Sequence, residues 1–257
     1  MFSFYIKSVV MKKIFFGLFL LVAIHSISGQ TEILKNNGSW FTFSNKIVIS
    51  DKFYIVNAYQ QRRVGFVEKI EGFFFTPSLN YRLTNNISVG AGYIYYKGFP
   101  NGVSHRPIHW TENTFFQHIT VSSNAGKIGI NQRFMFEERT IDLINTDVTP
   151  NVISGNKHTS RFRYRLQASI NLFKLKNDKF LIGKLSNETR IRFSDGVANP
   201  DFDQNNFAAL LGYKLLDNSS VWMGYGRFYC KVNSSQYIAN NLLHLNLSYN
   251  IDLRKKK

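Results

Sequence analysis

The chain is short of cysteine, proline and long apolar runs, and each shortage excludes a class of protein. Its 257 residues include one cysteine, Cys230, so no disulfide scaffold can form within the chain. Five prolines and 17 glycines are too few for a collagen-like or linker-like sequence. With 44% apolar residues the chain is too apolar to be disordered, and its mean hydropathy of -0.18 is too low for a bundle of membrane helices.

Acidic residues are also scarce, whereas aromatic residues are abundant. The sequence holds 16 Asp and Glu against 32 Lys and Arg, a formal charge of +16, and it contains 24 Phe, 13 Tyr and 3 Trp. A basic surplus of this size indicates an acidic partner or surface without identifying it.

The amino-terminal residues have the pattern of a secretory signal peptide. Lys12 and Lys13 precede an apolar run over 14–24, and small or polar residues follow it. A short basic region, an apolar region of about 7–15 residues and a small-residue end mark such peptides. The run is shorter than the roughly 20 residues of a spanning helix, and no cysteine follows it to carry a lipid anchor. We therefore expect cleavage near Gly29 and Gln30.

Beyond the signal pattern, apolar and polar residues alternate, which indicates strands with two different faces. The clearest segments are 73–84, 127–139, 160–173 and 240–253. They run about 10–14 residues, longer than the 5–6 typical of soluble proteins. A tilted strand needs about 9–11 residues to cross a bilayer, so this length favours a membrane barrel.

Short and long connections separate the predicted strands. Short turns of Asn, Asp and Gly occur at 85–86, 124–126, 177–178 and 217–218, and long connections at 97–109, 140–159, 194–203 and 233–238. Short periplasmic turns opposite long loops are typical of outer-membrane barrels. Four of the five prolines lie in the long connections, whereas Pro77 lies inside a strand and predicts a bulge or a later strand start there.

The strand patterns give the predicted fold. Eleven patterns occur, at 40–49, 52–63, 72–84, 87–96, 110–123, 127–139, 160–174, 179–193, 204–216, 219–232 and 240–253. Bacterial single-chain barrels have an even number of strands. A short strand near 31–37 would raise the number of strands to twelve, whereas leaving 40–49 outside the wall would lower it to ten. We predict an all-β fold, an antiparallel up-and-down transmembrane β-barrel of twelve strands, with ten as the alternative.

This interpretation divides the chain into a signal peptide over 1–29, a single barrel domain over 30–253 and a basic tail over 254–257. Met11 becomes the start if 1–10 are an upstream extension. Removing 1–29 takes away three lysines, so 32 minus 3 leaves 29 basic residues against 16 acidic ones, a charge of +13. The positive charge therefore belongs to the mature protein.

Aromatic residues gather near the predicted strand ends, as the interfacial girdles of a membrane barrel require. They are Trp40, Phe41, Phe73, Phe74, Tyr93, Tyr95, Tyr96, Trp110, Phe193, Phe228 and Tyr229. A soluble sandwich or lipocalin-like barrel with an aromatic core is the alternative. It explains the turns but not the length of the strands.

A series of short motifs runs through the chain in a fixed order. They are Trp40, 90–93, Glu112 with Gln117, 133–139, 161–165, Glu188, 202–205, 224–225 and 244–247. In order and spacing, over roughly 38–253, they resemble the domain-of-unknown-function family 2490, outer-membrane barrels common in Bacteroidetes. The resemblance implies a barrel fold and an outer-membrane location, and it implies no activity. The chain departs from the family pattern at Asn206, where the pattern has Arg, and in the tail, where many barrels end in an aromatic residue.

If the apolar faces meet lipid, charged residues of three neighbouring strands face the lumen. They are Arg133, Glu137, Arg139, Arg161, Arg163, Arg165, Lys184, Glu188, Arg190 and Arg192. In a small barrel such side chains can meet across the lumen, where an unpaired charge is costly. We expect a structural network of arginines and glutamates, with an anion-selective constriction as the sharper alternative.

A barrel enzyme or binder acting on lipid or glycolipid is the competing class. His118 and His244 are the candidate strand histidines, with Ser169 and Ser248 as candidate nucleophiles. Both histidines fall on predicted inward faces, away from lipid. We therefore expect a protein without catalysis.

We expect no cofactor and no metal. His105 and His109 form a loop pair without a third ligand, and Cys230 is interpreted as a small packed residue. Arginines alternating with aromatic residues over 161–165 imitate a nucleic-acid platform, but the secretion signal opposes nucleic-acid binding. The expected partners are outer-membrane lipid, lipopolysaccharide phosphates and the barrel-assembly machinery.

Overall fold

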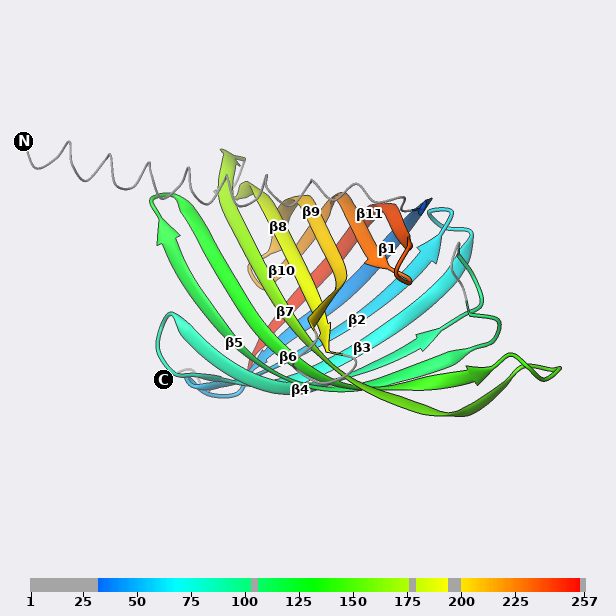
Figure 1. Ribbon diagram of the computed structural model, residues 1–257. Helices are drawn as coiled ribbons and strands as arrows, with labels where there is room; N and C mark the ends of the chain where they lie inside the picture. The colour runs from blue at the N-terminus through cyan, green and yellow to red at the C-terminus, as the bar shows by residue number, and fades with distance from the viewer. Residues whose placement is uncertain (1–31, 103–105, 176–178, 194–199, 255–257) are drawn as a thin grey trace, which may run out of the picture. The chain divides into compact units, whose positions relative to one another are not determined.

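The structure, a computed structural model, describes residues 32–102, 106–175, 179–193 and 200–254. These residues form strands β1 (Glu32–Val48), β2 (Phe53–Val64), β3 (Lys69–Arg82), β4 (Ile87–Gly98), β5 (Trp110–Ala125), β6 (Ile128–Asn145), β7 (Val152–Lys174), β8 (Phe180–Phe193), β9 (Pro200–Leu216), β10 (Ser219–Lys231) and β11 (Gln236–Asp252) (Figure 1). Among them there is no helix with the length and apolar character needed to span a membrane. The predicted signal peptide and the last three residues of the predicted tail lie outside the described residues.

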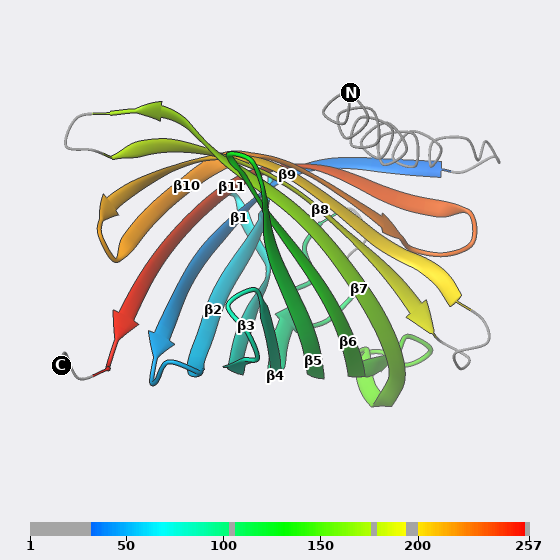
Figure 2. The same cartoon turned by 90° about the vertical axis from the view of Figure 1, so that its left-hand side faces the viewer.

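The strands close into a barrel in the order β1-β11-β10-β9-β8-β7-β6-β5-β4-β3-β2. Every strand from β2 to β11 is antiparallel to the strand before it. Because the number of strands is odd, β1 and β11 run in the same direction where the wall closes. Figure 2 shows their arrowheads side by side and pointing the same way.

The closing pair of strands, β1 and β11, is the seam of the barrel. Contacts at both ends of the seam show that its two strands run parallel. Asn241 Nδ2 donates a hydrogen bond to Asn37 Oδ1 over 3.4 Å. Further along, the Leu253 amide donates to the Val48 carbonyl over 2.9 Å. Residue numbers rise together on the two strands, which is the mark of parallel pairing.

The prediction of twelve or ten strands, all antiparallel, is therefore wrong for the described residues. The eleven segments read from the sequence correspond to the eleven strands, and the even number came from a rule for barrels with an antiparallel closure. Parallel pairing uses evenly spaced, slanted hydrogen bonds and needs no even number. The extra strand expected near 31–37 is the first part of β1, which runs unbroken to Val48.

A pair of cysteines across the seam tests the parallel register. In a Cys230→Ser background, Asn37→Cys with Asn241→Cys should form a disulfide, because the two native side chains already touch. Asn37→Cys with Leu247→Cys is the control, since six residues along β11 place the second thiol about 20 Å further away. Mass spectrometry of unreduced peptides reads both pairs. Cross-linking in the control pair but not in the first would refute the register.

The strands β6 and β7 are the longest, with 18 and 23 residues, and their hairpin extends beyond its neighbours (Figure 1). The prediction of a long connection over 140–159 is wrong. Pairing continues to Asn145 and Val152, which leaves 146–151 as the turn. β-Branched residues such as Ile141 and Ile153 favour the extended backbone on both sides of this turn.

Pro77 lies within β3 without the bulge predicted for it. The register of β3 against β2 shifts between Arg62 and Arg63, away from the proline. Pairing of β3 with β4 skips Thr76 and Pro77 and resumes at Ser78 in the same register. The missing N–H of proline thus removes ladder bonds without moving the strand.

The predicted alternation between an apolar outer face and a polar inner face is confirmed. On β6, Phe134 is 39% exposed, whereas Glu137 is fully buried. Every strand projects exposed apolar side chains outward, among them Phe43, Tyr59, Phe75, Tyr93, Phe115, Phe134, Leu166, Leu185, Leu211, Met223 and Leu247. The wall therefore separates a charged interior from an apolar exterior.

The aromatic residues are divided between the two faces, so the predicted outer girdles account for only part of them. Trp40, Tyr96 and Phe228 are buried inside the barrel. Phe73 and Phe74 are neighbours on β3, and the second of them packs on the inward ring of Tyr96 with 4.3 Å between ring centroids. Adjacent residues of a strand point to opposite faces, so a run of aromatic residues cannot lie on one surface.

Candidate functional site in the barrel interior

Glu137 of β6 is the centre of a charged network inside the barrel. Its Oε2 accepts a hydrogen bond from Arg161 Nε at 2.5 Å, and its Oε1 accepts one from Arg163 Nη1 at 2.6 Å. Both arginines come from β7, which pairs with β6 so that Arg161 lies opposite Glu137. One fully buried carboxylate therefore serves two guanidinium groups.

Glu188 of β8 is the second centre of the network. Its Oε1 accepts hydrogen bonds from Arg163 Nη2 at 2.6 Å and from Arg190 Nη2 at 2.9 Å. Its Oε2 accepts one from Arg133 Nη2 at 2.7 Å. Arg163 thus bridges Glu137 and Glu188, and the network crosses β6, β7 and β8. Charge-assisted bonds of this kind are roughly twice as strong as neutral ones.

Two carboxylates that sequence reasoning did not predict add to the charged interior, Glu112 in a separate ion pair and Asp203 as a further partner of Arg161. Glu112 of β5 accepts two bonds from Arg139, one from Nε and one from Nη2, each 2.8 Å long. Asp203 of β9 accepts a bond from Arg161 Nη1 at 3.0 Å. Glu112 lies six residues before His118 on β5 and therefore on the same face. This alternation could have predicted that Glu112 faces inward. Asp203 lies at a register shift between β8 and β9, where alternation fails as a guide.

Six of the ten predicted lumen residues meet in this network: Arg133, Glu137, Arg161, Arg163, Glu188 and Arg190. A seventh, Arg139, forms the separate pair with Glu112. Arg192 lies at its edge, 3.3 Å from Asp201 and 3.9 Å from Asp203. Lys231 also reaches Asp201, at 2.7 Å, which gives this partly exposed carboxylate two cations.

Arg165 and Lys184 are two further predicted lumen residues that the structure keeps outside the network. Arg165 Nη2 donates to the amide oxygen of Asn131 at 3.2 Å. The Lys184 ammonium lies 3.4 Å from the centroid of the Trp222 ring. Neither side chain is placed in an ion pair within the part of the chain that the structure describes.

Arg62 of β2, which sequence reasoning missed, is held by aromatic rings. Its guanidinium lies 3.8 Å from the centroid of Trp40 and 4.3 Å from that of Phe74. Its Nε donates to Gln60 Oε1 at 3.1 Å, and Phe228 packs edge-on against Trp40. A desolvated cation–π contact contributes about 2 kcal/mol.

Apolar side chains fill the interior beside these charges. Ile94, Phe116 and Met135 form a buried cluster in which Phe116 is 2% exposed. Exclusion of water strengthens each ion pair and makes an unpaired charge costly. The arrangement can therefore hold several strands rigidly together through paired charges.

The residues considered for catalysis are not brought together. His118 Nε2 lies 3.0 Å from Asn80 Oδ1, and His244 packs against the ring of Trp40 with centroids 5.1 Å apart. The Ser248 hydroxyl lies 2.6 Å from a serine hydroxyl of β10. The described contacts thus link these histidines to an amide, to the Thr120 hydroxyl at 3.3 Å and to a ring rather than to a serine.

The residues considered for metal binding or thiol chemistry are also dispersed. His109 packs on Phe99 at 5.0 Å between ring centroids, and His105 lies outside the described residues. Cys230 packs against the inward cluster of Trp40, Phe228 and Leu242. Over the described ranges, no three His, Cys, Asp or Glu side chains are placed to hold a metal ion.

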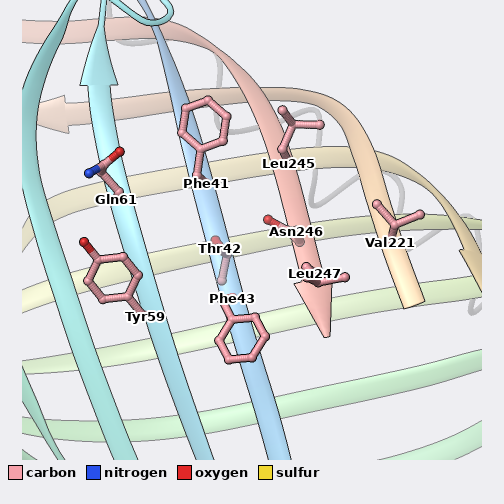
Figure 3. Close-up of a pocket in the computed structure, with 9 residues that line it drawn as sticks. All are labelled: Phe41, Thr42, Phe43, Tyr59, Gln61, Val221, Leu245, Asn246 and Leu247. Carbon is pink, nitrogen blue, oxygen red and sulfur yellow. The ribbon is translucent and has the colours of Figure 1, made fainter. Parts of the chain in front are cut away.

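A shallow hollow lies on the outer face over the seam. Figure 3 shows Phe41 and Phe43 of β1, Leu245 and Leu247 of β11 and Tyr59 of β2 around it. Its lining contains no charged residue. The hollow is therefore a gap between projecting apolar side chains and is separate from the charged interior.

Comparison with known proteins identifies a family. No curated protein and no solved structure matches the chain significantly. A family model described as "Protein of unknown function (DUF2490)" matches residues 37–239, which is more than half of the chain and includes every member of the charged network. The 244–247 motif lies beyond the matched residues. The chain therefore belongs to the DUF2490 family of proteins of unknown function.

Proposed function

We propose that this barrel spans the outer membrane of a bacterium as a structural protein with a largely ion-paired interior and without catalysis. The observation that carries the proposal is the outer face. Leu185 is 55% exposed and Met223 58%, and comparable side chains project from every strand. A water-soluble monomer rarely exposes so continuous an apolar surface, whereas a lipid-facing barrel requires it.

Polar side chains on the outer face bond to one another, which also suits a lipid environment. Asn187 and Asn205 exchange hydrogen bonds of 3.2 and 3.0 Å across β8 and β9. The Tyr164 hydroxyl donates to Gln132 Oε1 at 2.9 Å. A polar group that faces hydrocarbon is costly unless it has a partner, whereas water would serve on a soluble surface.

The sequence supports the same location. The signal-peptide pattern before residue 30 supports export, and the family resemblance supports an outer-membrane barrel. The proposed partners are membrane lipid, lipopolysaccharide phosphates attracted by the basic surplus, and the barrel-assembly machinery. The odd number of strands departs from other bacterial barrels, and the parallel seam is how this wall accommodates it.

Membrane fractionation followed by electrophoresis tests the location. The chain should be recovered with outer membranes, and an unboiled sample should migrate faster than a boiled one because the folded barrel stays compact in detergent. Recovery in the soluble periplasmic fraction, with no shift on boiling, would instead establish a soluble lipocalin-like barrel.

Conductance across a planar bilayer distinguishes a filled barrel from a narrow pore. The wild-type protein should give no unitary conductance, because the charged network and the aromatic rings around Arg62 occupy the interior. An anion-selective conductance that disappears when Arg163 and Arg165 are both replaced by methionine would replace the structural role with a pore.

A further inference from the structure

The charges inside the barrel do not balance near the carboxylate of Glu188. That carboxylate attracts Arg165 electrostatically, but its hydrogen bonds go to three other arginines. Arg165 bonds only to an amide oxygen, and Lys184 rests on an aromatic ring. Two cations on neighbouring strands are thus left without a bonded carboxylate among the described residues.

Arg165 lies close to a third cation, Arg133, and we call Arg133, Arg165 and Lys184 the basic cluster. Arg133 of β6 lies directly opposite Arg165 of β7, with about 5 Å between Cβ atoms at such positions. Lys184 of β8 lies opposite Ser169, four residues along β7 from Arg165, and its charge acts on Arg165 from there. Like charges held this close repel one another unless an anion lies between them.

Two donors of the basic cluster are buried without a hydrogen-bond acceptor. They are Nε of Arg133 and Nε of Arg165. A buried donor left unpaired destabilises the folded protein, and it does so more strongly when it is charged. His118 of β5 lies within range of both charges, but its Nε2 is already turned to Asn80. The cluster therefore combines surplus positive charge with unused donors.

We propose that the basic cluster binds a small oxyanion of the phosphate type inside the barrel. A tetrahedral oxyanion can accept bonds from the two facing guanidinium groups at once, and the charge of Lys184 adds to the attraction. It would neutralise Arg165 and Lys184, which no carboxylate of the described ranges contacts. The cluster lies on the inner face of the wall, so the anion is a dissolved one rather than a lipid headgroup. The inference therefore stands apart from the membrane location.

Calorimetric titration of the folded full chain with inorganic phosphate tests the proposal, with chloride at equal ionic strength as the reference. Wild type should bind phosphate saturably, and the affinity of Arg165→Met for phosphate should be lower by about tenfold or more. Lys127→Met removes the same charge in the β5–β6 turn and should bind like wild type. Absence of saturable binding by wild type, or equal binding by Arg165→Met, would overturn the proposal.

Unfolding without phosphate separates binding from a structural role. Among the described residues Arg165 has no ion pair, and it faces Arg133, so Arg165→Met should raise the unfolding midpoint of the phosphate-free protein. At one phosphate concentration, phosphate should raise the midpoint of wild type by more than that of the variant, because the variant binds it more weakly. A lower midpoint for phosphate-free Arg165→Met would make Arg165 a structural residue and overturn the proposal. If the barrel proves soluble, both experiments run without detergent, so failure of the membrane proposal does not affect them.

Discussion

The variant Glu137→Gln should unfold at a much lower denaturant concentration than wild type. The substitution keeps the shape of a fully buried side chain and removes the charge that Arg161 and Arg163 share. Breaking a buried ion pair costs about 3–5 kcal/mol. We expect the lower end of this range, because Arg161 keeps Asp203 and Arg163 keeps Glu188. Urea unfolding of protein folded in detergent micelles measures the loss.

Glu138→Gln is the matched control for this prediction. Glu138 is the next residue of β6, lies on the outer side and is exposed, where the Ser160 hydroxyl donates to it at 2.8 Å. Its substitution should change the free energy of unfolding by less than about 0.5 kcal/mol. Equal losses in the two variants would show that the buried network does not hold the barrel together.

The variant Leu211→Arg should fold poorly into lipid vesicles. Leu211 is 52% exposed and lies in the middle of an apolar stretch on the outer face of β9, between Phe207 and Leu215. An arginine facing lipid at the bilayer midplane costs about 2–4 kcal/mol in a barrel. The free energy of folding into phosphatidylcholine vesicles, from denaturant titration, measures this cost.

Leu215→Arg separates a lipid effect from a general one. Leu215 is on the same face of β9, four residues nearer the turn, and is 43% exposed. Near the interface the same substitution costs about 0–1 kcal/mol. In a water-soluble barrel both arginines would be solvated, and the two variants would have similar stability. Equal stability in vesicles would therefore argue against a membrane-spanning wall.

The strands and their faces were predictable because the two surfaces of the wall require side chains of opposite polarity. Where a charged interior backs on an apolar exterior, each residue must differ from the next, as in Arg161, Phe162, Arg163 and Tyr164. Such a pattern is local and needs no knowledge of the partner strand. It located all eleven strands and most of the inward charges.

The closure of the wall was not predictable from such patterns. The patterns gave eleven strands, but Asn37 and Asn241 meet because β11 closes on β1, and no local residue pattern records which strands pair there or in which direction. Arg62 was missed for a different reason. It lies in the run Gln60, Gln61, Arg62 and Arg63, where neighbours do not differ in polarity and the inward side cannot be read.

The partners of the inward charges were also beyond local patterns. Arg163 and Arg165 are two residues apart on the same face of β7, yet only Arg163 bonds to a carboxylate. Which arginine meets Glu137 depends on the register of β6 and β7 and on the level within the barrel. The paired network and the unpaired basic cluster therefore appear only once the strands are assembled.

Contact between β8 and lipid tests the membrane-spanning account most directly. Leu185 and Ser186 are neighbours on opposite faces of β8, and each can be replaced by a single cysteine in a Cys230→Ser background. A bimane label on each cysteine, in vesicles whose lipids carry a nitroxide near the acyl-chain ends, reports contact as quenching. The account predicts strong quenching at position 185 and little at 186. An unquenched label at position 185 in the folded, vesicle-bound protein would contradict it.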